Sequence, residues 1–239
     1  MRIRTLALLA CITAAPGVSA SVLVAQSLRA TDSVQHQRLS GKKAAVAGIL
    51  LLTSGFADQG LRGELQEHRS HASNSVARVG NALGDPLYVI SGIGLGLLAG
   101  EVSGSEDLTR LAWRAGSAAA MASGVTTFLK YTVGRTRPSY GDSDDFKPFG
   151  GGTSFPSGHT ALAFAVATVI ADETRDGWSD ALVYGAATLT AYARMNDDRH
   201  WASDVLAGAL VGHLSARFLS RRDVSLRLAP QTIGLSYGF

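Results

Sequence analysis

The sequence predicts an all-α protein, a six-helix bundle followed by a short C-terminal β-hairpin. Six charge-free segments rich in Ala, Gly, Leu and Val follow the first 26 residues, and Ala and Leu favour helix over strand. Charged residues make up 17% of the chain and hydrophobic residues 46%, a mix that suits tightly packed helices in or near a membrane. The six segments are residues 44–57, 86–100, 115–129, 160–171, 181–193 and 205–216.

The N-terminus has the pattern of a secretory signal peptide, assigned to residues 1–25. A basic start (MRIR) precedes an apolar stretch, and small residues allow cleavage after Ala20 or Ala25. The single cysteine, Cys11, lies inside this leader, so chemistry based on cysteine is excluded from the mature chain. We therefore expect an exported protein with an N-terminal helical region at 26–84 and the main bundle at 85–222.

The charge distribution excludes nucleic acid as a partner. The net charge is +3, and no run of Lys or Arg exceeds two residues. A small anionic substrate is still compatible with this balance, because a few well-placed cations suffice to bind it. Two polar connections, residues 57–75 and 134–158, are long enough to carry a functional site.

The C-terminal tail, residues 223–239, differs from the rest of the chain. Apolar residues alternate with other residues on both sides of a Pro-Gln-Thr break, which is the period of a β-strand. One hairpin cannot close a barrel, so we interpret the tail as an edge hairpin or a segment that docks onto a partner.

Polar residues of the kinds that bind phosphate collect at one end of the predicted bundle. In an up-and-down arrangement, the end of the third segment, the start of the fourth, the end of the fifth and the start of the sixth lie on the same side. The long 134–158 connection lies there too. The residues gathered at this end are Lys130, Arg137, Ser157, Gly158, His159, Arg194, His200 and Asp204.

This combination predicts phosphoryl transfer through a phosphohistidine. A lysine, two arginines and the free N–H groups of a helix start all favour an anion. His200 and Asp204 are four residues apart and are expected to share a helix face. The carboxylate can then hold one imidazole N–H while the other ring nitrogen attacks, and His159 would protonate the leaving oxygen.

Each of these features also has a purely structural interpretation. Ser157 is a typical helix cap, and cations at helix ends often balance the helix dipole. The acidic stretch GDSDD (141–145) suits either a divalent cation or a solvated loop. The histidines without such companions, which we interpret as structural, are His36, His68, His71 and His213.

Three ordered motifs resemble those of the type 2 phosphatidic acid phosphatase and vanadium haloperoxidase superfamily. They are KYTVGRTRP (130–138), FPSGHT (155–160) and RMNDDRHWASD (194–204). The family pattern is Lys-x6-Arg-Pro, then Pro-Ser-Gly-His, then Ser-Arg-x5-His-x3-Asp. One position departs from it, because Ala193 stands where the family usually has Ser. The resemblance covers about residues 85–218.

The resemblance implies an all-helical bundle of the type 2 phosphatidic acid phosphatase kind and a role for each motif residue. His200 would be the nucleophile, Asp204 its orienting partner and His159 the acid. The phosphate would be held without a metal or other cofactor, and vanadate is expected to inhibit. The residues expected to bind the phosphate are Lys130, Arg137, Ser157, Gly158 and Arg194.

The sequence therefore favours an exported, metal-independent phosphomonoesterase of phosphorylated small molecules or lipids, with lipid phosphates and isoprenoid diphosphates among the candidates. A vanadium-dependent haloperoxidase and a non-catalytic envelope protein are the alternatives. Charge-free stretches of 12 to 15 residues fall short of the roughly 20 that span a bilayer. This favours a periplasmic bundle, soluble or attached to the membrane, over a multi-span protein.

Overall fold

The computed structural model describes residues 55–222, 225–229 and 232–236. The predicted signal peptide and all but the last three residues of the first charge-free segment lie outside this part of the chain. The domain boundaries derived from the sequence stay predictions.

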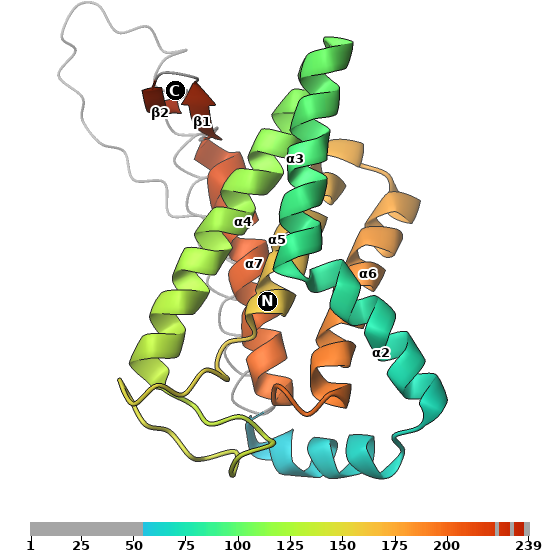
Figure 1. The fold of residues 1–239 in the computed structure, drawn as a ribbon, viewed down its shortest axis with the longest axis vertical. Helices are drawn as coiled ribbons and strands as arrows, with labels where there is room; N and C mark the ends of the chain where they lie inside the picture. The colour runs from blue at the N-terminus through green and yellow to red at the C-terminus, as the bar shows by residue number, and fades with distance from the viewer. Residues whose placement is uncertain (1–54, 223–224, 230–231, 237–239) are drawn as a thin grey trace, which may run out of the picture. The chain divides into compact units, whose positions relative to one another are not determined.

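The described chain is a bundle of helices (Figure 1). Every charge-free segment from 86 onward lies inside one helix, and each helix extends beyond its segment because polar residues and caps continue it. α4, for example, begins after the N-cap Ser105 and ends at Gly134, whose positive φ of 62° suits glycine. The helices are residues 55–67, α2 (His71–Gly84), α3 (Pro86–Ser103), α4 (Glu106–Val133), α5 (Gly158–Thr174), α6 (Gly177–Asn196) and α7 (Ala202–Arg222).

The region before α3 corrects the prediction of a polar connection over residues 57–75. Residues 55–67 are helical, and α2 starts at His71. A reciprocal pair of hydrogen bonds between Ser70 and Ser73 caps the start of α2, so this polar stretch contains a helix start.

The bundle is centred on α5, which packs against α4, α6 and α7. Small residues such as Ala118, Ala122, Ala161 and Ala165 fill the interface, so the helices approach closely. A side chain at Gly212 of α7 would place its Cβ 2.1 Å from the carbonyl oxygen of Ala161. The abundance of Ala and Gly in the sequence therefore reflects tight helix packing.

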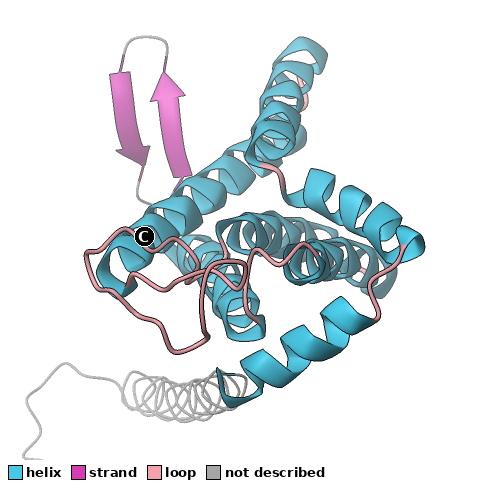
Figure 2. Cartoon of the chain, turned by 60° about the horizontal axis from the view of Figure 1, so that its bottom comes forward, coloured by secondary structure: helices cyan, strands magenta, loops and turns pink. Residues whose placement is uncertain are grey.

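The helix ends expected to form the site meet at one end of the bundle. The loop between α4 and α5 crosses this end, close to the start of α7 (Figure 2). A short bridge between Arg135 and Phe146 folds the loop back on itself. The end of α4 and the starts of α5 and α7 are thereby brought within contact distance of the same loop.

Two short strands follow α7. β1 (Ser225–Ala229) and β2 (Thr232–Ser236) pair antiparallel, with Arg227 opposite Gly234.

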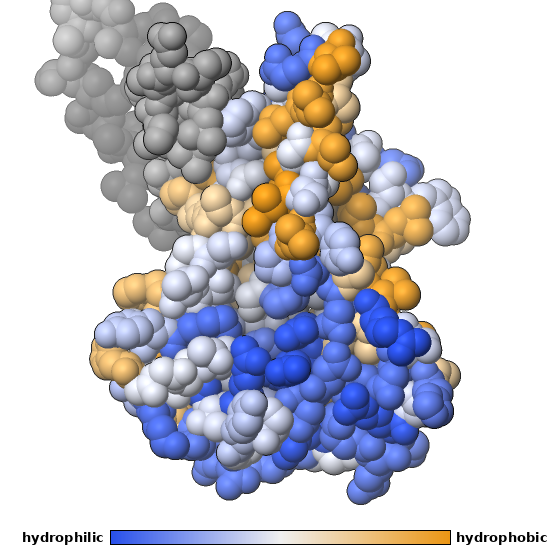
Figure 3. Space-filling model, in the orientation of Figure 1, coloured by the Kyte–Doolittle hydropathy of each residue, from blue (hydrophilic) through white to orange (hydrophobic). Residues whose placement is uncertain are grey.

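Hydropathy divides the visible surface into two zones (Figure 3). Apolar side chains gather over α3, whereas the end that carries the α4–α5 loop is polar. Leu87, Ile90, Leu95 and Val102 of α3 are all exposed. Within the described residues, α3 is the one helix long and apolar enough to cross a membrane, and very little of it is buried in the bundle.

Candidate active site

Lys130 lies in the last turn of α4 and reaches across to the segment that leads into α5. Its Nζ donates to the carbonyl oxygens of Thr153 and Pro156 at 2.5 and 2.6 Å, and to that of Ser154 at 3.3 Å. An ammonium group has three N–H donors, so all three are engaged with main chain. Lys130 thus ties the two motifs together and brings its charge to the start of α5.

Arg137 and Arg194 are both partly buried and both keep unused donors. Arg194 donates from Nη1 to Asn81 Oδ1 at 2.8 Å. The Nε atoms of both arginines are buried and find no hydrogen-bond partner among the described residues. Buried donors on cations are costly unless an acceptor meets them, so this pair is suited to bind an anion.

Ser157, Gly158 and His159 form the start of α5. Ser157 occupies the N-cap position and is fully buried, but its hydroxyl makes no capping bond to the helix and instead accepts from Thr160 Oγ1 at 2.9 Å. The interpretation of this side chain as an ordinary cap is therefore wrong. The first N–H groups of α5 have no partner within the helix and face the end of the bundle where the arginines lie.

His200 and Asp204 meet at the start of α7. The helix begins at Ala202, so His200 precedes it and does not share a helix face with Asp204, contrary to the sequence prediction. The two side chains still approach, with His200 Nδ1 3.6 Å from Asp204 Oδ2, slightly beyond hydrogen-bond range. Both side chains are buried.

Asp204 is held from several sides besides His200. Its Oδ2 accepts from Ser154 Oγ at 2.5 Å and from the main-chain N–H of Trp201 at 3.0 Å. Its Oδ1 accepts from Arg135 Nη1 at 2.8 Å. Arg135 was not among the residues predicted for the site, although it lies inside the first motif.

The family match agrees with this geometry. The family model for the PAP2 superfamily matches residues 111–225, which contain every residue predicted for the site. Residues 111–225, 115 of the 239 residues of the chain, are therefore similar to the PAP2 superfamily. The match ends at residue 225, so the hairpin of β1 and β2 lies almost entirely beyond it.

Two curated relatives share sequence with part of the PAP2 region. The lipid A 1-phosphatase of Porphyromonas gingivalis is 41% identical over 97 residues, which are 40% of this chain and 20% of that protein. The lipid A 4'-phosphatase of Bacteroides thetaiotaomicron is 32% identical over 93 residues, 36% of this chain and 41% of that protein. The aligned part of the chain thus spans between a fifth and two fifths of these relatives.

Two solved structures share the PAP2 fold. LpxE of Aquifex aeolicus aligns with a TM-score of 0.57 and 22% identity, covering 69% of this chain and 94% of that one. A transmembrane PAP2-type phosphatidylglycerolphosphate phosphatase of Bacillus subtilis aligns with a TM-score of 0.55 and 17% identity, covering 74% and 94%. The all-helical bundle predicted from the motifs is confirmed.

Burial and crowded cations lower the pKa values of the basic groups in the PAP2 site. Burial, together with Arg137 and Arg194, lowers the pKa of Lys130 to about 8, although Asp204 acts in the opposite direction. Burial also lowers the pKa of His200 to about 4, so its imidazole is neutral at pH 7. The same cause, with help from Arg194, lowers the pKa of His159 to about 4.

Asp204 and Asp85 supply negative charge to the site. Burial acts to raise the pKa of Asp204, but His200, Arg135 and Ser154 outweigh it and hold the pKa below its usual value. Asp85 is the N-cap of α3, where it accepts from the Leu87 N–H at 2.8 Å. Its charge also acts to raise the pKa of His159. The sequence does not predict this effect, because Asp85 is a helix cap that lies far from the three motifs.

The acidic stretch 141–145 is engaged within its own loop. Asp145 accepts from Thr136 Oγ1 at 2.8 Å and from Lys147 Nζ at 3.1 Å. Across the residues that the structure describes, no three His, Cys, Asp or Glu side chains form a group that could hold a metal ion. His213, interpreted as structural, lies among helices with its Nδ1 3.1 Å from Thr168 Oγ1.

Proposed function

We propose that this PAP2 protein is a metal-independent phosphatase that hydrolyses phosphomonoesters of lipids through a phosphohistidine on His200. The observation that carries the proposal is the pairing of two partly buried arginines, whose buried Nε donors are unused, with a neutral, buried histidine beside a carboxylate. The arginines and the N–H groups of α5 would bind the phosphate oxygens, and Lys130 would add positive charge beside them. Vanadate, which resembles the five-coordinate transition state, is expected to inhibit.

The chemistry divides into two displacements at phosphorus. In the first, His200 Nε2 forms a bond to phosphorus while the bond to the ester oxygen breaks, and that oxygen takes a proton from His159. In the second, a water oxygen attacks phosphorus, His159 accepts a proton from it, and the bond to Nε2 breaks. The positive charge that develops on the His200 ring during the first step is stabilised by Asp204 through Nδ1–H.

The low pKa values suit the two histidines to these roles in different ways. A neutral His200 is ready to attack at pH 7. His159 must carry a proton to act as the acid, and in the free protein the neighbouring arginine and lysine oppose this. A bound phosphate brings negative charge that offsets those cations, so the pKa of His159 is expected to rise when substrate binds.

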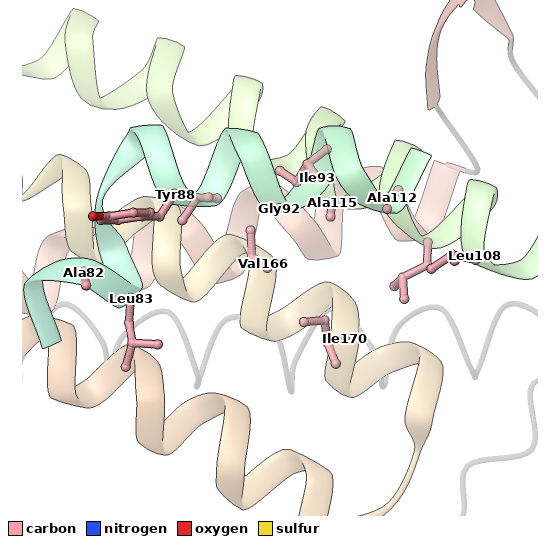
Figure 4. Close-up of a pocket in the computed structure, with 13 residues that line it drawn as sticks. Ala82, Leu83, Tyr88, Gly92, Ile93, Leu108, Ala112, Ala115, Val166 and Ile170 are labelled. Atoms are coloured by element: carbon pink, nitrogen blue, oxygen red, sulfur yellow. The ribbon is translucent and has the colours of Figure 1, made fainter. Parts of the chain in front are cut away.

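An apolar cavity next to the site supports a lipid substrate. It has a volume of about 380 Å³ and is lined by α2, α3, α4 and α5. Figure 4 shows Leu83, Ile93, Leu108 and Val166 around it, and Tyr88 supplies the one side-chain hydroxyl among the described lining residues. We propose that an acyl chain of the substrate occupies this cavity.

One end of the cavity lies at the junction of α2 and α3, close to the start of α5. Leu83 and Tyr88 line the cavity, and Asp85 between them acts electrostatically on His159. The end of α2 also lies against the start of α5, since a Cβ at Gly84 would lie 3.2 Å from the His159 carbonyl oxygen. A lipid with its phosphate between the arginines would therefore have its chain near this groove.

The apolar surface of α3 also supports a location at a membrane. The exposed apolar face of α3 lies beside the cavity, and the polar end carries the site. We propose that the exported protein attaches to the membrane through α3, so that lipid substrates enter the cavity from the bilayer. Carbonate washing of cell membranes tests this, because material removed by the wash would contradict attachment through an inserted apolar helix.

Phosphate release from a lipid monophosphate in detergent micelles tests the function, with a short-chain phosphate ester as the comparison. We expect turnover of the lipid, its loss in His200→Ala, and recovery of labelled phosphate on His200 after rapid quenching. Label on a serine or a carboxylate would contradict the mechanism. Equal kcat/KM for the lipid and the short-chain ester would contradict the acyl-chain site.

A further inference from the structure

A buried polar cluster surrounds Asp204, and its other members have no role in the steps above. It consists of Arg135, Asp58, Ser203 and Asp204, which we call the Arg135 cluster. Arg135 Nη1 donates to Asp204 Oδ1 at 2.8 Å and to Ser203 Oγ at 2.6 Å, and Nη2 donates to Asp58 Oδ2 at 2.7 Å. Arg135 is 3% exposed and the two carboxylates are 1% and 0% exposed. Water therefore contributes little screening within this cluster.

All of the described hydrogen bonds of the Asp58 side chain are to members of this cluster. Its Oδ1 accepts from the Ser203 N–H at 2.9 Å, and its Oδ2 accepts from Ser203 Oγ at 2.6 Å as well as from Arg135. Asp58 comes from the helix at 55–67, outside the part of the chain that the PAP2 family model matches. It thus supplies a charge to the site from a separate element.

The same helix also contacts the end of α6 and the segment that follows it. Arg62, one turn after Asp58, donates from Nε and Nη2 to the two carboxylate oxygens of Asp198, each at 2.7 Å. Gln66, one turn further, donates to the carbonyl oxygens of Met195 and Asn196 at 3.3 Å. Arg62 also lies 5.6 Å from the centre of the Trp201 ring, which Arg135 approaches at 5.4 Å. Among the described residues, no hydrogen bond joins Arg62 or Gln66 to the four residues of the Arg135 cluster.

The charges in the Arg135 cluster do not cancel. One guanidinium lies between two carboxylates, which leaves a net charge of about −1 beside His200. With Arg135 paired to Asp204 alone, the guanidinium would neutralise the carboxylate that must stabilise a positive imidazole ring. The second carboxylate prevents this.

We propose that Asp58 is a positioning residue that offsets the charge of Arg135, so that Asp204 keeps its negative charge for His200 during phosphoryl transfer. This inference rests on the proposed function. Asp58 acts through Arg135 and Asp204 and does not itself touch the phosphate. Its removal is therefore expected to slow the chemical step more than it weakens substrate binding.

The charged groups that surround His200 fix the direction of the expected pH effect. Asp204 comes from α7, Lys130 from the end of α4, and Arg194 from the end of α6. The loop after α4 adds Arg135, and the helix at 55–67 adds Asp58. Removing the charge of Asp58 leaves the cations in greater excess, so protonation of His200 becomes harder and its pKa falls.

The test compares Asp58→Asn with Arg62→Met in the full chain. NMR titration of 13C-labelled histidine follows His200, whose resonance is identified by its loss in His200→Gln. We expect Asp58→Asn to lower the titration midpoint of His200 and to reduce kcat by roughly 10- to 100-fold with KM within about twofold. Arg62→Met removes the ion pair with Asp198 and the contact with the Trp201 ring but none of the hydrogen bonds within the Arg135 cluster, so it is expected to leave the midpoint at the wild-type value.

A double variant checks the charge argument and covers the case in which Asp58→Asn does not fold. Asp58→Asn combined with Arg135→Met removes one negative and one positive charge, so the net charge beside His200 is again about −1. We expect its His200 midpoint to lie at or above the wild-type value. A midpoint that stays below it, an unchanged midpoint in Asp58→Asn, or an equal shift in Arg62→Met would overturn the proposal.

These titrations need no turnover, so they separate the two proposals. A wild-type protein without phosphatase activity would contradict the proposed function, whereas the His200 midpoints would still decide whether Asp58 sets the charge at the histidine.

Discussion

Asp204→Asn is expected to destabilise the protein as well as inactivate it. Asn keeps the shape of the side chain but replaces one oxygen with an NH2 donor and removes the charge. The bond from Arg135 Nη1 to Oδ1, at 2.8 Å, loses its ionic component, and the bonds from Ser154 and Trp201 both depend on Oδ2. If the NH2 group takes the place of Oδ1, it faces the Arg135 donor, and if it takes the place of Oδ2, it faces the donors of Ser154 and Trp201.

The size of the effect follows from burial. Breaking a buried ion pair by removing one partner costs about 3–5 kcal/mol, and Arg135 is 3% exposed. For a chain of this length each kcal/mol lowers Tm by roughly 2–4 °C, so the expected loss is about 6–20 °C. Arg135 keeps its ion pair with Asp58 in this variant, so its charge is not left unpaired. We therefore expect a Tm loss toward the lower end of that range.

The assay measures thermal unfolding and phosphatase activity side by side, with His200→Gln as the matched control. His200→Gln removes the proposed nucleophile but none of the hydrogen bonds that hold Asp204, so we expect it to be inactive with Tm close to that of the wild type. An inactive Asp204→Asn protein that unfolds at the wild-type temperature would refute the reasoning. It would show that Asp204 only orients the histidine and that the buried contacts add no stability.

Three further outcomes are expected. The pKa of Lys130 is lowered to about 8, so its ammonium group loses its proton as the pH rises past that value. We therefore expect kcat/KM to fall by about tenfold per pH unit above pH 8, and a flat profile to about pH 10 would contradict this. Gly208→Ala would place a Cβ 2.4 Å from the Ser157 carbonyl oxygen, so it should lower both activity and Tm, whereas Gly185→Ala, with nothing within 4 Å, should change neither. Activity should survive dialysis against a strong chelator, since the proposed cations are side chains; loss of the rate with recovery on added magnesium would count against that.

The sequence by itself determined the class of the fold and the chemical groups of the site. Apolar segments without charge marked the cores of the helices from α3 to α7, because helix formation and burial depend on local composition and period. The order of Lys130, the Pro-Ser-Gly-His run and His200 along alternating helix ends was enough to predict that they meet. Short-range rules of this kind can be read from neighbouring residues.

Only the tertiary structure decided how those groups are held. In the sequence, Arg135 is a cation in a polar loop with nothing to distinguish it from its neighbours. Asp58 lies 77 residues away in another polar stretch and is equally inconspicuous. Their pairing depends on two elements meeting in space, and no local period encodes such a contact. The engagement of Lys130 with main-chain carbonyls, the buried hydroxyl of Ser157 and the position of His200 ahead of α7 were likewise fixed by packing. Burial removes these charges from water, and their interactions then depend on the arrangement of the whole bundle.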